Sequence, residues 1–451
     1  MSGDVALLYR FDADIRSIDR KGDRITLDVA GWRSVTFAPS SPACADAVMA
    51  LHGRGATLAH LSGIAGDGRK DDGIDHYIAR FSQARFLSWT VTGARGDLAE
   101  ITGLAGGYRP RPDSPPPGTP LALCRFAYLR RHEGRSILDS AAIRARATLS
   151  PAGIQALATS MVQSADNDGF AVALWQLGFF DLAEPREGDA RRSWEFHDLV
   201  MHETSRFDRH LPRGQTYRFK DRFASPPAIR PPPTGERVGL PAVEAARPRP
   251  SSQPLETLQA RRRSIRRYAD RAMPLATVGE FLWRVCRTTG RLDDGAGGLI
   301  TRPYPSAGNL NELEFYLAVR RCEGLSPAVY HYDGHGHGLT RLPASAGIAG
   351  KIVERAAEAI GLAADASRPD LTIVISSRIP RLAWKYESVA YRLSLLNVGV
   401  VFELMYLVAT DMNLAPCASG SGSSQLLQAA LDGDPYEEVA IGEFSLALPA
   451  D

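Results

Sequence analysis

Two proline-rich stretches divide this chain of 451 residues. The first runs from Arg109 to Pro120, and the second runs from about Ser225 to Pro254. Because proline fixes φ and has no backbone N–H, such stretches favour extended, semi-rigid connectors. The sequence therefore predicts domains at residues 1–108, 120–205 and 255–451, with residues 206–254 as a proline-rich linker.

The first piece predicts a small sheet followed by helices. Residues 7–29 alternate in strand fashion around a Lys21-Gly22-Asp23 turn, and a third strand is expected at residues 35–37. A helix should start at Ser41-Pro42, because serine caps a helix and proline suits its first turn. A later helix, ending in a strand, is expected over residues 79–91.

The second piece repeats this order. It has strands around His132-Glu133-Gly134, a helix from Ser150-Pro151, and a closing helix, turn and strand over residues 174–182. This is the order of a winged-helix-like module, so two such α+β modules are predicted. Each serves either as structural padding or as an edge strand that pairs with an extended peptide. Residues 194–202 predict a helix that bridges to the linker.

Composition excludes several classes of function. The formal net charge is +2, from 53 basic and 51 acidic residues, and neither module has a helix dense in Lys and Arg, so no nucleic acid partner is expected. The five cysteines are scattered and odd in number, which argues against a disulfide framework and a structural zinc site. The start lacks the regions of a signal peptide, and a cytoplasmic protein is expected.

The most apolar stretch runs from Leu393 to Ala409. It contains Ser394, Asn397 and Glu403, and it is shorter than the roughly 20 residues of a membrane-spanning helix. We expect a buried helix in a core or a subunit interface, and no membrane partner.

The last piece predicts an α+β domain. An amphipathic helix is expected over residues 275–285, a buried strand over 314–319, a hairpin over 329–342, a central strand over 371–376, and a long helix from about Lys385 to Asn413. Glycines and Asp333 give the segment from His331 to His337 the character of a turn, without fixed helical spacing of its histidines, so no metal site is predicted.

A cluster of arginines opens this domain. Five of the seven residues from Arg261 to Arg267 are arginine, and Ser264 adds a hydroxyl. Guanidinium groups match phosphate oxygens, and the small residues of Pro305-Ser306-Ala307-Gly308-Asn309 allow close approach of a flat ligand. The pair indicates a phosphorylated cofactor; the alternatives for the cluster alone are a solvated face or a nucleic-acid patch.

Together these two segments resemble the FMN-binding signature of the nitroreductase superfamily. The segment from Lys385 to Arg392 further resembles the Lys-Tyr-x-x-x-Ala-Tyr-Arg element of the SagB-type dehydrogenases, which are FMN-dependent azoline oxidases of peptide-modifying pathways. These matches cover about Leu258 to Phe444, and the tandem N-terminal units resemble those of the longer members. The resemblance implies a nitroreductase-like domain with a long central helix.

The resemblance also implies the cofactor, FMN, and the residues that bind it. Phosphate contacts fall to Arg262, Arg263 and Ser264, and Arg266 should lie near the flavin ring or the ribityl chain. The remaining flavin contacts carried over are Ser306, Gly308, Asn311, and Ser419 and Gly420 in the loop of residues 419–424. One departure is that no Lys or Arg follows Arg392, so the Arg262–Arg267 cluster must hold most of the phosphate.

The catalytic residues implied are Lys385 and Tyr386. Aromatising an azoline removes a hydride and a proton, and an adjacent lysine charge favours the phenolate form of a tyrosine that takes the proton. Neighbours on a helix do not face one another, so both should reach one site only at a helix start. The alternative is that Lys385 caps a surface turn and Tyr386 packs.

The resemblance implies three partners: a precursor peptide as substrate, a cyclodehydratase complex, and a second copy of the chain in a homodimer. Two other functions stay open, a flavin oxidoreductase acting on another substrate and a non-catalytic scaffold that binds the peptide and cyclodehydratase. The choice between thiazoline and oxazoline and the electron acceptor also stay open.

Overall fold

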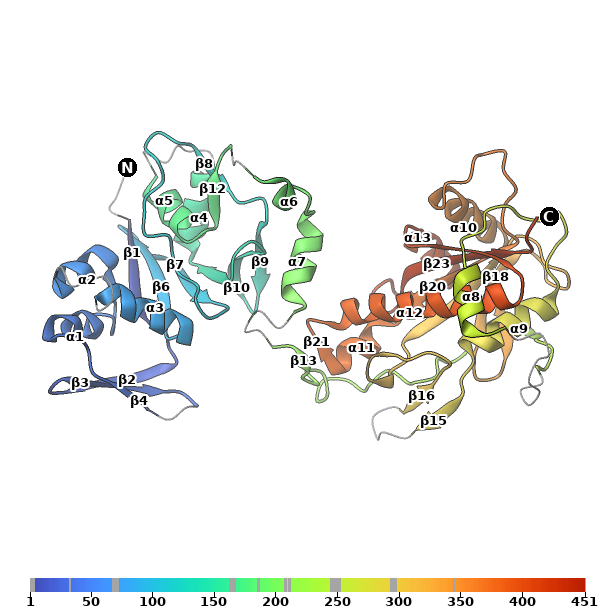
Figure 1. The fold of residues 1–451 in the computed structure, drawn as a ribbon, viewed down its shortest axis with the longest axis horizontal. Helices are drawn as coiled ribbons and strands as arrows, with labels where there is room; N and C mark the ends of the chain where they lie inside the picture. Colours follow the sequence, from blue (N-terminus) through green and yellow to red (C-terminus); the bar gives the residue numbers. More distant parts are fainter. Residues whose placement is uncertain are drawn as a thin grey trace. The chain divides into compact units, whose positions relative to one another are not determined.

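In the computed structural model the chain forms two compact units, residues 1–211 and 212–451, each described by itself (Figure 1). The structure describes residues 5–31, 34–66, 73–161, 168–184, 187–206, 209, 212–243, 253–292, 298–343 and 345–450.

The N-terminal unit is a mixed α/β structure. Its strands are β1 (Ala6–Phe11), β2 (Ile15–Lys21), β3 (Arg24–Val29), β4 (Val35–Phe37), β5 (Ala56–Thr57), β6 (Leu87–Gly93), β7 (Gly96–Gly103), β8 (Leu121–Leu123), β9 (Ala127–His132), β10 (Arg135–Ser140), β11 (Ala145–Leu149) and β12 (Phe180–Leu182). Its helices are α1 (Pro42–Met49), α2 (Leu58–Ala65), α3 (Ile74–Ala84), α4 (Pro151–Ser160), α5 (Gly169–Gln176), α6 (Asp189–Arg192) and α7 (Phe196–Thr204).

Local sequence signals set the boundaries of these elements. Glycine at positive φ turns the hairpins at Gly22 and Gly134, where strands flank it on both sides. The Ser41 and Ser150 hydroxyls accept hydrogen bonds from backbone N–H groups of the first turns of α1 and α4, and proline follows each cap. The predicted hairpins, helix starts and closing strands are confirmed.

Strands of both predicted modules join one sheet, in the order β5-β1-β6-β7-β11-β10-β9 (Figure 1), while β2, β3 and β4 form a separate sheet and β8 pairs with β12. β7 pairs with β11 in antiparallel register, Ile101 opposite Ala147, across the first proline-rich stretch. One continuous core includes Ile25, Trp89 and Leu138. The winged-helix character of each half, and a boundary between residues 108 and 120, stay predictions.

The C-terminal unit also mixes helices and strands. Its strands are β13 (Gly214–Gln215), β14 (Arg237–Gly239), β15 (Gly290–Leu292), β16 (Leu299–Thr301), β17 (Leu313–Val319), β18 (Ala328–Asp333), β19 (Gly338–Arg341), β20 (Leu371–Ser377), β21 (Tyr386–Glu387), β22 (Ala415–Ser419) and β23 (Val439–Ala447). Its helices are α8 (Leu255–Arg261), α9 (Leu275–Cys286), the short 3₁₀ helix η2 (Ala307–Asn309), α10 (Ala346–Ala359), α11 (Ile379–Lys385), α12 (Ala390–Asp411) and α13 (Ser424–Leu431).

This unit has three layers. Its sheet has the order β14-β19-β18-β17-β20-β23-β22, with α9 and α12 contributing to the core on one face, and α10 and α13 on the other (Figure 1). Every residue of β17 is buried, because Phe315 and Leu317 point to the first core while Tyr316 and Ala318 point to the second. The predicted α+β architecture of the C-terminal domain, with its long central helix, is confirmed.

The long helix starts later than the sequence predicts. It runs from Ala390, not from about Lys385, because Lys385 ends α11 and Tyr386 begins the short strand β21. Ser388, at φ 63°, breaks the helical path between them. The expectation of one continuous helix over 385–413 is therefore wrong at its beginning.

The compact C-terminal unit takes in most of the segment predicted as linker, beginning at Pro212. β13 pairs with β21, and β14 adds an edge strand to the large sheet. The carbonyl groups of Pro226 and Pro227 accept hydrogen bonds from buried Arg381 and Arg378. A proline-rich segment still offers its carbonyl oxygens, so arginine side chains can hold it against a domain.

Among the described helices, α12 alone is long and apolar enough to cross a membrane by length and composition. Val398, Val401 and Met405 are buried in the C-terminal core. This packing is that of a core helix, as the sequence predicts.

Candidate active site

Lys385 and Tyr386 meet at the glycine of η2. Gly308 has φ 57°, and a Cβ atom at this position would overlap the Tyr386 hydroxyl and lie 3.1 Å from Lys385 Nζ. Lys385 Nζ also lies 5.6 Å from the centre of the Tyr386 ring. The structure thus brings three predicted site residues together, and only a glycine leaves the room for both side chains.

The change from helix to strand explains how sequence neighbours reach one place. Tyr386 has an extended backbone, φ −110° and ψ 130°, directly after the last residue of α11. It pairs with Gln215 of β13, and the Lys385 carbonyl accepts a hydrogen bond from the Tyr217 N–H at 3.3 Å. The prediction that this pair lies at a helix start is therefore wrong. The pair lies at the end of a helix, where residues 214–217 hold it.

Arg381 holds the base of this arrangement. Its buried guanidinium donates hydrogen bonds to three carbonyl groups: those of Leu310 at 2.6 Å, Pro226 at 2.5 Å and Gly298 at 2.9 Å. One side chain of α11 therefore ties the turn after Gly308 to the proline-rich segment.

Ser306 and Asn311 flank this turn. The Ser306 hydroxyl accepts a hydrogen bond from the Asn311 N–H at 3.0 Å and donates one to Glu312 at 3.3 Å. The Asn311 side-chain amide donates to the Ile300 carbonyl, while its buried Oδ1 has no partner among the described residues. Ser306 and Asn311 thus shape the turn, and Oδ1 remains available to a ligand donor.

Sequence reasoning missed Glu312 and Asn397. The carboxylate of Glu312, fully buried, accepts hydrogen bonds from Ser394 at 3.0 Å and from the Asn397 amide at 3.0 and 3.1 Å. Asn397 also accepts a hydrogen bond from the Ala307 N–H at 3.2 Å. The signal was present, because Ser394 and Asn397 interrupt an otherwise apolar helix. We call residues 306–312, with Lys385, Tyr386 and Asn397, the turn end of the site.

Arg262 and Ser264 gather around Tyr406 of α12. The Ser264 and Tyr406 hydroxyls lie 2.7 Å apart, and the Arg262 guanidinium lies 5.3 Å from the centre of the Tyr406 ring. The Tyr406 hydroxyl accepts a hydrogen bond from the Ala418 N–H at 2.9 Å. Residues 262–265 therefore lie beside the end of β22, next to the loop of residues 419–424.

The other two arginines of this group are exposed. Arg263 and Arg266 face solvent, whereas Arg262 and Ser264 are half-buried. Burial raises the pKa of the Cys417 thiol, and the nearby Arg266 charge opposes that rise, so Arg266 lies next to β22. Several positive charges thus converge on an open surface.

The loop of residues 419–424 rests on a buried carboxyl. A Cβ atom at Gly422 would overlap the Glu443 carboxyl, and the Ser423 N–H donates to Glu443 Oε1 at 3.2 Å. Burial raises the pKa of Glu443 to about 7, although this hydrogen bond opposes the shift, and Oε2 has no partner among the described residues. Ser419 is buried opposite Glu443, whereas Gly420 is exposed with open space around it. We call Arg262–Arg266, Tyr406 and residues 419–424 the arginine end.

The two ends lie along one helix. Asn397 belongs to the turn end and Tyr406 to the arginine end, so nine residues of α12 separate them, or about 13 Å along the axis. Within the described part of the chain, no hydrogen bond joins the two ends directly. The structure therefore places the predicted residues in two groups rather than in one cluster.

In the segment from His331 to His337, the first histidine forms a buried hydrogen bond with Glu314. Burial would raise the pKa of Glu314, but the hydrogen bond from His331 at 3.1 Å and the charge of Arg378 lower it to about 2. Among the described residues, no three His, Cys, Asp or Glu side chains gather in a way that could hold a metal ion.

Sequence comparisons place two family matches on the chain. Residues 260–442 match the nitroreductase family, and residues 121–211 match the family described as cyanobactin oxidase ThcOx. A Methanocaldococcus jannaschii protein assigned to the nitroreductases is 27% identical over 199 residues, covering 43% of this chain and 88% of the relative. These matches support an oxidoreductase related to nitroreductases and to a cyanobactin oxidase.

Solved structures with similar folds include a nitroreductase-like protein of Ralstonia eutropha, at 19% identity and TM-score 0.37, covering 53% of this chain and all of that one. Another, from Anabaena variabilis, has 21% identity and TM-score 0.38, and the match covers 55% of this chain and 45% of that one. The Escherichia coli microcin synthetase McbBCD, solved with truncated pro-MccB17 bound, has 18% identity and TM-score 0.35. This match covers 47% of this chain and 79% of that one. At TM-scores this low, these structures carry no inference about this chain.

Proposed function

We propose that this protein is an FMN-dependent dehydrogenase of the SagB type that oxidises azoline rings to azoles in a ribosomally made peptide. The observation that carries the proposal is the meeting of Lys385 Nζ and the Tyr386 hydroxyl over Gly308. The family matches to nitroreductases and to cyanobactin oxidase support the flavin and the peptide substrate.

The donor sets at both ends fit FMN. At the arginine end, Arg262 and Ser264 offer a guanidinium fork and a hydroxyl suited to a phosphate, with Arg263 and Arg266 adding positive charge. At the turn end, the buried Oδ1 of Asn311, which has no partner among the described residues, suits a ring with polar edges, while the space over Gly308 holds the Lys385 and Tyr386 side chains. Ser306, Ser419 and Gly420 complete the set of proposed flavin contacts.

FMN, when bound, accepts the hydride that leaves the azoline ring. The chain must take up the proton lost from the neighbouring ring carbon. Tyr386 is the proposed acceptor of this proton, and Lys385 Nζ lies 5.6 Å from the centre of the Tyr386 ring. Arg381 and residues 214–217 hold this pair in place, so the protein supplies a positioned base.

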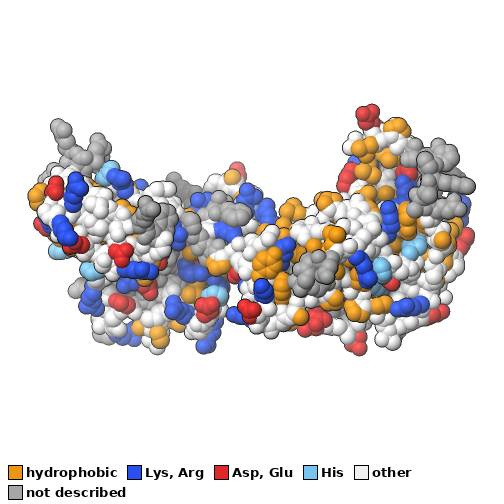
Figure 2. All heavy atoms as spheres, turned by 90° about the horizontal axis from the view of Figure 1, so that it is seen from below, with side chains coloured by type: hydrophobic (Ala, Val, Ile, Leu, Met, Phe, Trp, Pro, Cys, Tyr) orange, Lys and Arg blue, Asp and Glu red, His pale blue; other side chains and the backbone are white. Residues whose placement is uncertain are grey.

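The exposed face of α12 supports a homodimer. Tyr391, Leu395, Leu396 and Val400 are exposed and recur at helical spacing on this helix, and hydrophobic side chains, drawn orange, reach the surface in groups in Figure 2. An apolar stripe of this kind is suited to pairing with a second copy across a two-fold axis.

A precursor peptide and a cyclodehydratase complex are the other proposed partners, and the cytoplasm is the proposed compartment.

The proposal is tested with a peptide that carries thiazoline or oxazoline rings. Purified protein supplied with FMN and oxygen should convert these rings, with a mass loss of two hydrogens for each ring. Lys385→Ala and Tyr386→Phe should abolish most of this conversion, while Tyr436→Phe, at an exposed tyrosine outside the proposed site and stripe, should not. Undiminished azole formation by both catalytic variants would remove Lys385 and Tyr386 from the mechanism, whereas no azole formation by the wild type would favour a scaffold role.

A further inference from the structure

The N-terminal unit contains a hollow of about 420 Å³ that is rich in arginine. Residues 106–109 and Arg111, 142–144 and 176–178 line it, and they bring Arg109, Arg111 and Arg144 to one place. None of the described lining residues is acidic. In a chain with a formal net charge of only +2, this local excess of positive charge is a specific feature.

Hydrogen bonds fix the walls of this hollow. The bonds that join its segments run from Arg111 N to the Gln176 carbonyl at 2.7 Å, from the Tyr108 hydroxyl to the Leu177 carbonyl at 2.8 Å, and from Leu104 N to the Arg144 carbonyl at 2.8 Å. The backbone that carries the arginines is therefore held before any ligand arrives, which lowers the entropic cost of binding.

Two of the three guanidinium groups lack a partner among the residues that the structure describes. Arg111 lies over the Trp175 ring at 4.5 Å and reaches Asp181 at 3.7 Å. Arg109 and Arg144 are exposed, and neither side chain forms a hydrogen bond or ion pair with another residue in the described ranges. Their charges are thus available to an anion.

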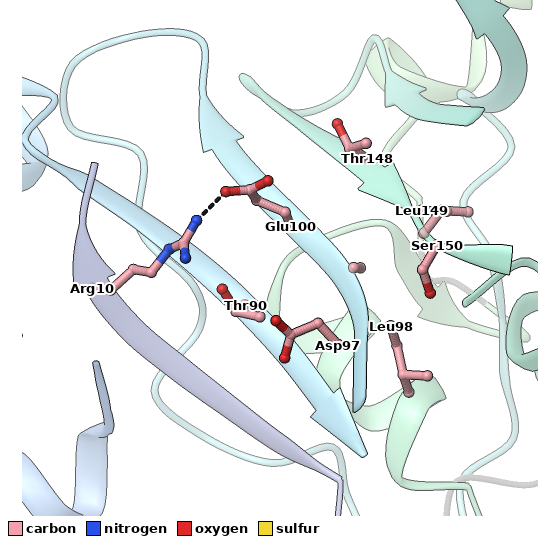
Figure 3. A pocket seen from close by; sticks show the side chains of 9 residues that line it. Arg10, Thr90, Asp97, Leu98, Glu100, Thr148, Leu149 and Ser150 are labelled. Carbon is pink, nitrogen blue, oxygen red and sulfur yellow. Dashed lines mark hydrogen bonds and ion pairs between the residues drawn. The ribbon is translucent and has the colours of Figure 1, made fainter. Parts of the chain in front are cut away.

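A second hollow in the same unit shows the opposite balance of charge. Figure 3 shows Arg10 turned toward Glu100, with which it forms an ion pair, while Asp97 lies at the same hollow. The single guanidinium there is neutralised and one carboxylate remains, so this hollow disfavours anions.

We propose that the hollow of Arg109, Arg111 and Arg144 binds an acidic peptide segment through its side-chain carboxylates. Guanidinium groups bind carboxylates in a fork geometry, and here they come from two separate segments, Arg109 and Arg111 from one and Arg144 from the other, which suits several carboxylates along a chain. A volume of about 420 Å³ also exceeds what one phosphate ion fills. The inference rests on the proposed function only where it identifies this peptide with the substrate.

The test measures binding of fluorescein-labelled hexaglutamate to the full chain by fluorescence anisotropy, with hexaglutamine as the neutral peptide. The wild type should bind hexaglutamate and not hexaglutamine, with affinity that falls as salt is added. The double variant Arg109→Ala/Arg144→Ala should bind about tenfold more weakly, because two exposed ion pairs are lost.

A charge-matched control is available on the β2–β3 hairpin. The side chains of Arg16 and Arg24 are exposed and form no hydrogen bond or ion pair with residues that the structure describes, so Arg16→Ala/Arg24→Ala removes the same charge elsewhere. This control should bind hexaglutamate as the wild type does.

Three outcomes would overturn the proposal: no binding of hexaglutamate, equal binding by the Arg109→Ala/Arg144→Ala variant, or equal weakening in the control. Displacement of hexaglutamate by inorganic phosphate at a molar concentration no higher than that of the peptide would show a phosphate site instead. The measurement needs neither flavin nor turnover, so its failure would leave the proposed function standing.

Discussion

The turn end and the arginine end of the candidate site are held in different ways. At the turn end, buried Glu312 collects hydrogen bonds from Ser394 and Asn397, and Tyr386 is buried against Gly308. At the arginine end, Arg263 and Arg266 face solvent, and the segment is held by the contact of Ser264 with Tyr406 and by the hydrogen bond from the Ile265 N–H to the Pro416 carbonyl. The turn end is therefore buried and hydrogen-bonded, which suits the chemistry proposed for it, and the arginine end is open and charged, which suits the proposed anchoring of the phosphate.

Changing the proposed base should have the largest effect. Tyr386→Phe keeps the ring but removes the hydroxyl at Gly308, and loss of a general base lowers the rate by roughly a thousandfold. Azole formation is the measurement, with Tyr436→Phe, at an exposed tyrosine outside the proposed site, as the control. A Tyr386→Phe enzyme with wild-type turnover would show that the turn end has no catalytic phenol.

The carboxyl under the arginine-end loop should make stability depend on pH. The pKa of Glu443 is raised to about 7 in the folded state, so the folded protein binds a proton that the unfolded chain releases near pH 4.5. The protonated Glu443 therefore stabilises the folded state fully below pH 4.5. As pH rises through 7 this contribution is lost, and the free energy of unfolding falls by about 3 kcal/mol. Denaturant unfolding from pH 4.5 to 8 measures it.

Glu443→Gln is the matched variant for this comparison. It keeps an oxygen for the Ser423 N–H but cannot ionise. The difference in unfolding free energy between wild type and variant should change with pH in the stated direction. A difference that stays constant between pH 4.5 and 8 would contradict the raised pKa.

Adding a methyl group at Gly308 should displace the Tyr386 hydroxyl and distort the turn end. In Gly308→Ala the new methyl group overlaps the Tyr386 hydroxyl, and φ 57° is unfavourable for alanine by roughly 1 kcal/mol. Displacing the phenol by a fraction of its size should lower turnover about a hundredfold. FMN binding should be weakened less than turnover, which a flavin titration can measure. Gly347→Ala, exposed with nothing near its Cβ position, is the control and should keep wild-type turnover.

Removing the half-buried guanidinium should affect anchoring only. Arg262→Ala should weaken FMN binding about tenfold, because a charge-assisted hydrogen bond to phosphate is lost. Turnover at saturating FMN should stay near wild type. Arg271→Ala, an exposed arginine outside the cluster, is the control. Equal FMN affinity in Arg262→Ala and wild type would move the phosphate away from the arginine end.

Most of the regular elements could be predicted from the sequence, because their signals are local. Proline after a capping serine marks α1 and α4, and glycine at positive φ marks the hairpins. Both faces of β17 are buried, and the sequence shows this strand as a nearly continuous apolar run. Such features depend on neighbours in the chain and not on the tertiary fold.

The features that the sequence did not predict depend on distant contacts. The break between Lys385 and Ala390 follows from pairing of β21 with residues 214–215, far away in the chain. Asn397 was visible as a polar residue in an apolar helix, but its partner Glu312 was not. Glu443 stands out in an apolar strand, yet only the fold shows the loop that covers it.

The most direct test of the account is the visible absorption spectrum of the purified protein after incubation with FMN and gel filtration. The account predicts a flavin spectrum in the wild type and in Tyr386→Phe, and a much weaker one when Arg262 and Ser264 are both replaced by alanine. A wild-type protein that stays colourless after this treatment would contradict it.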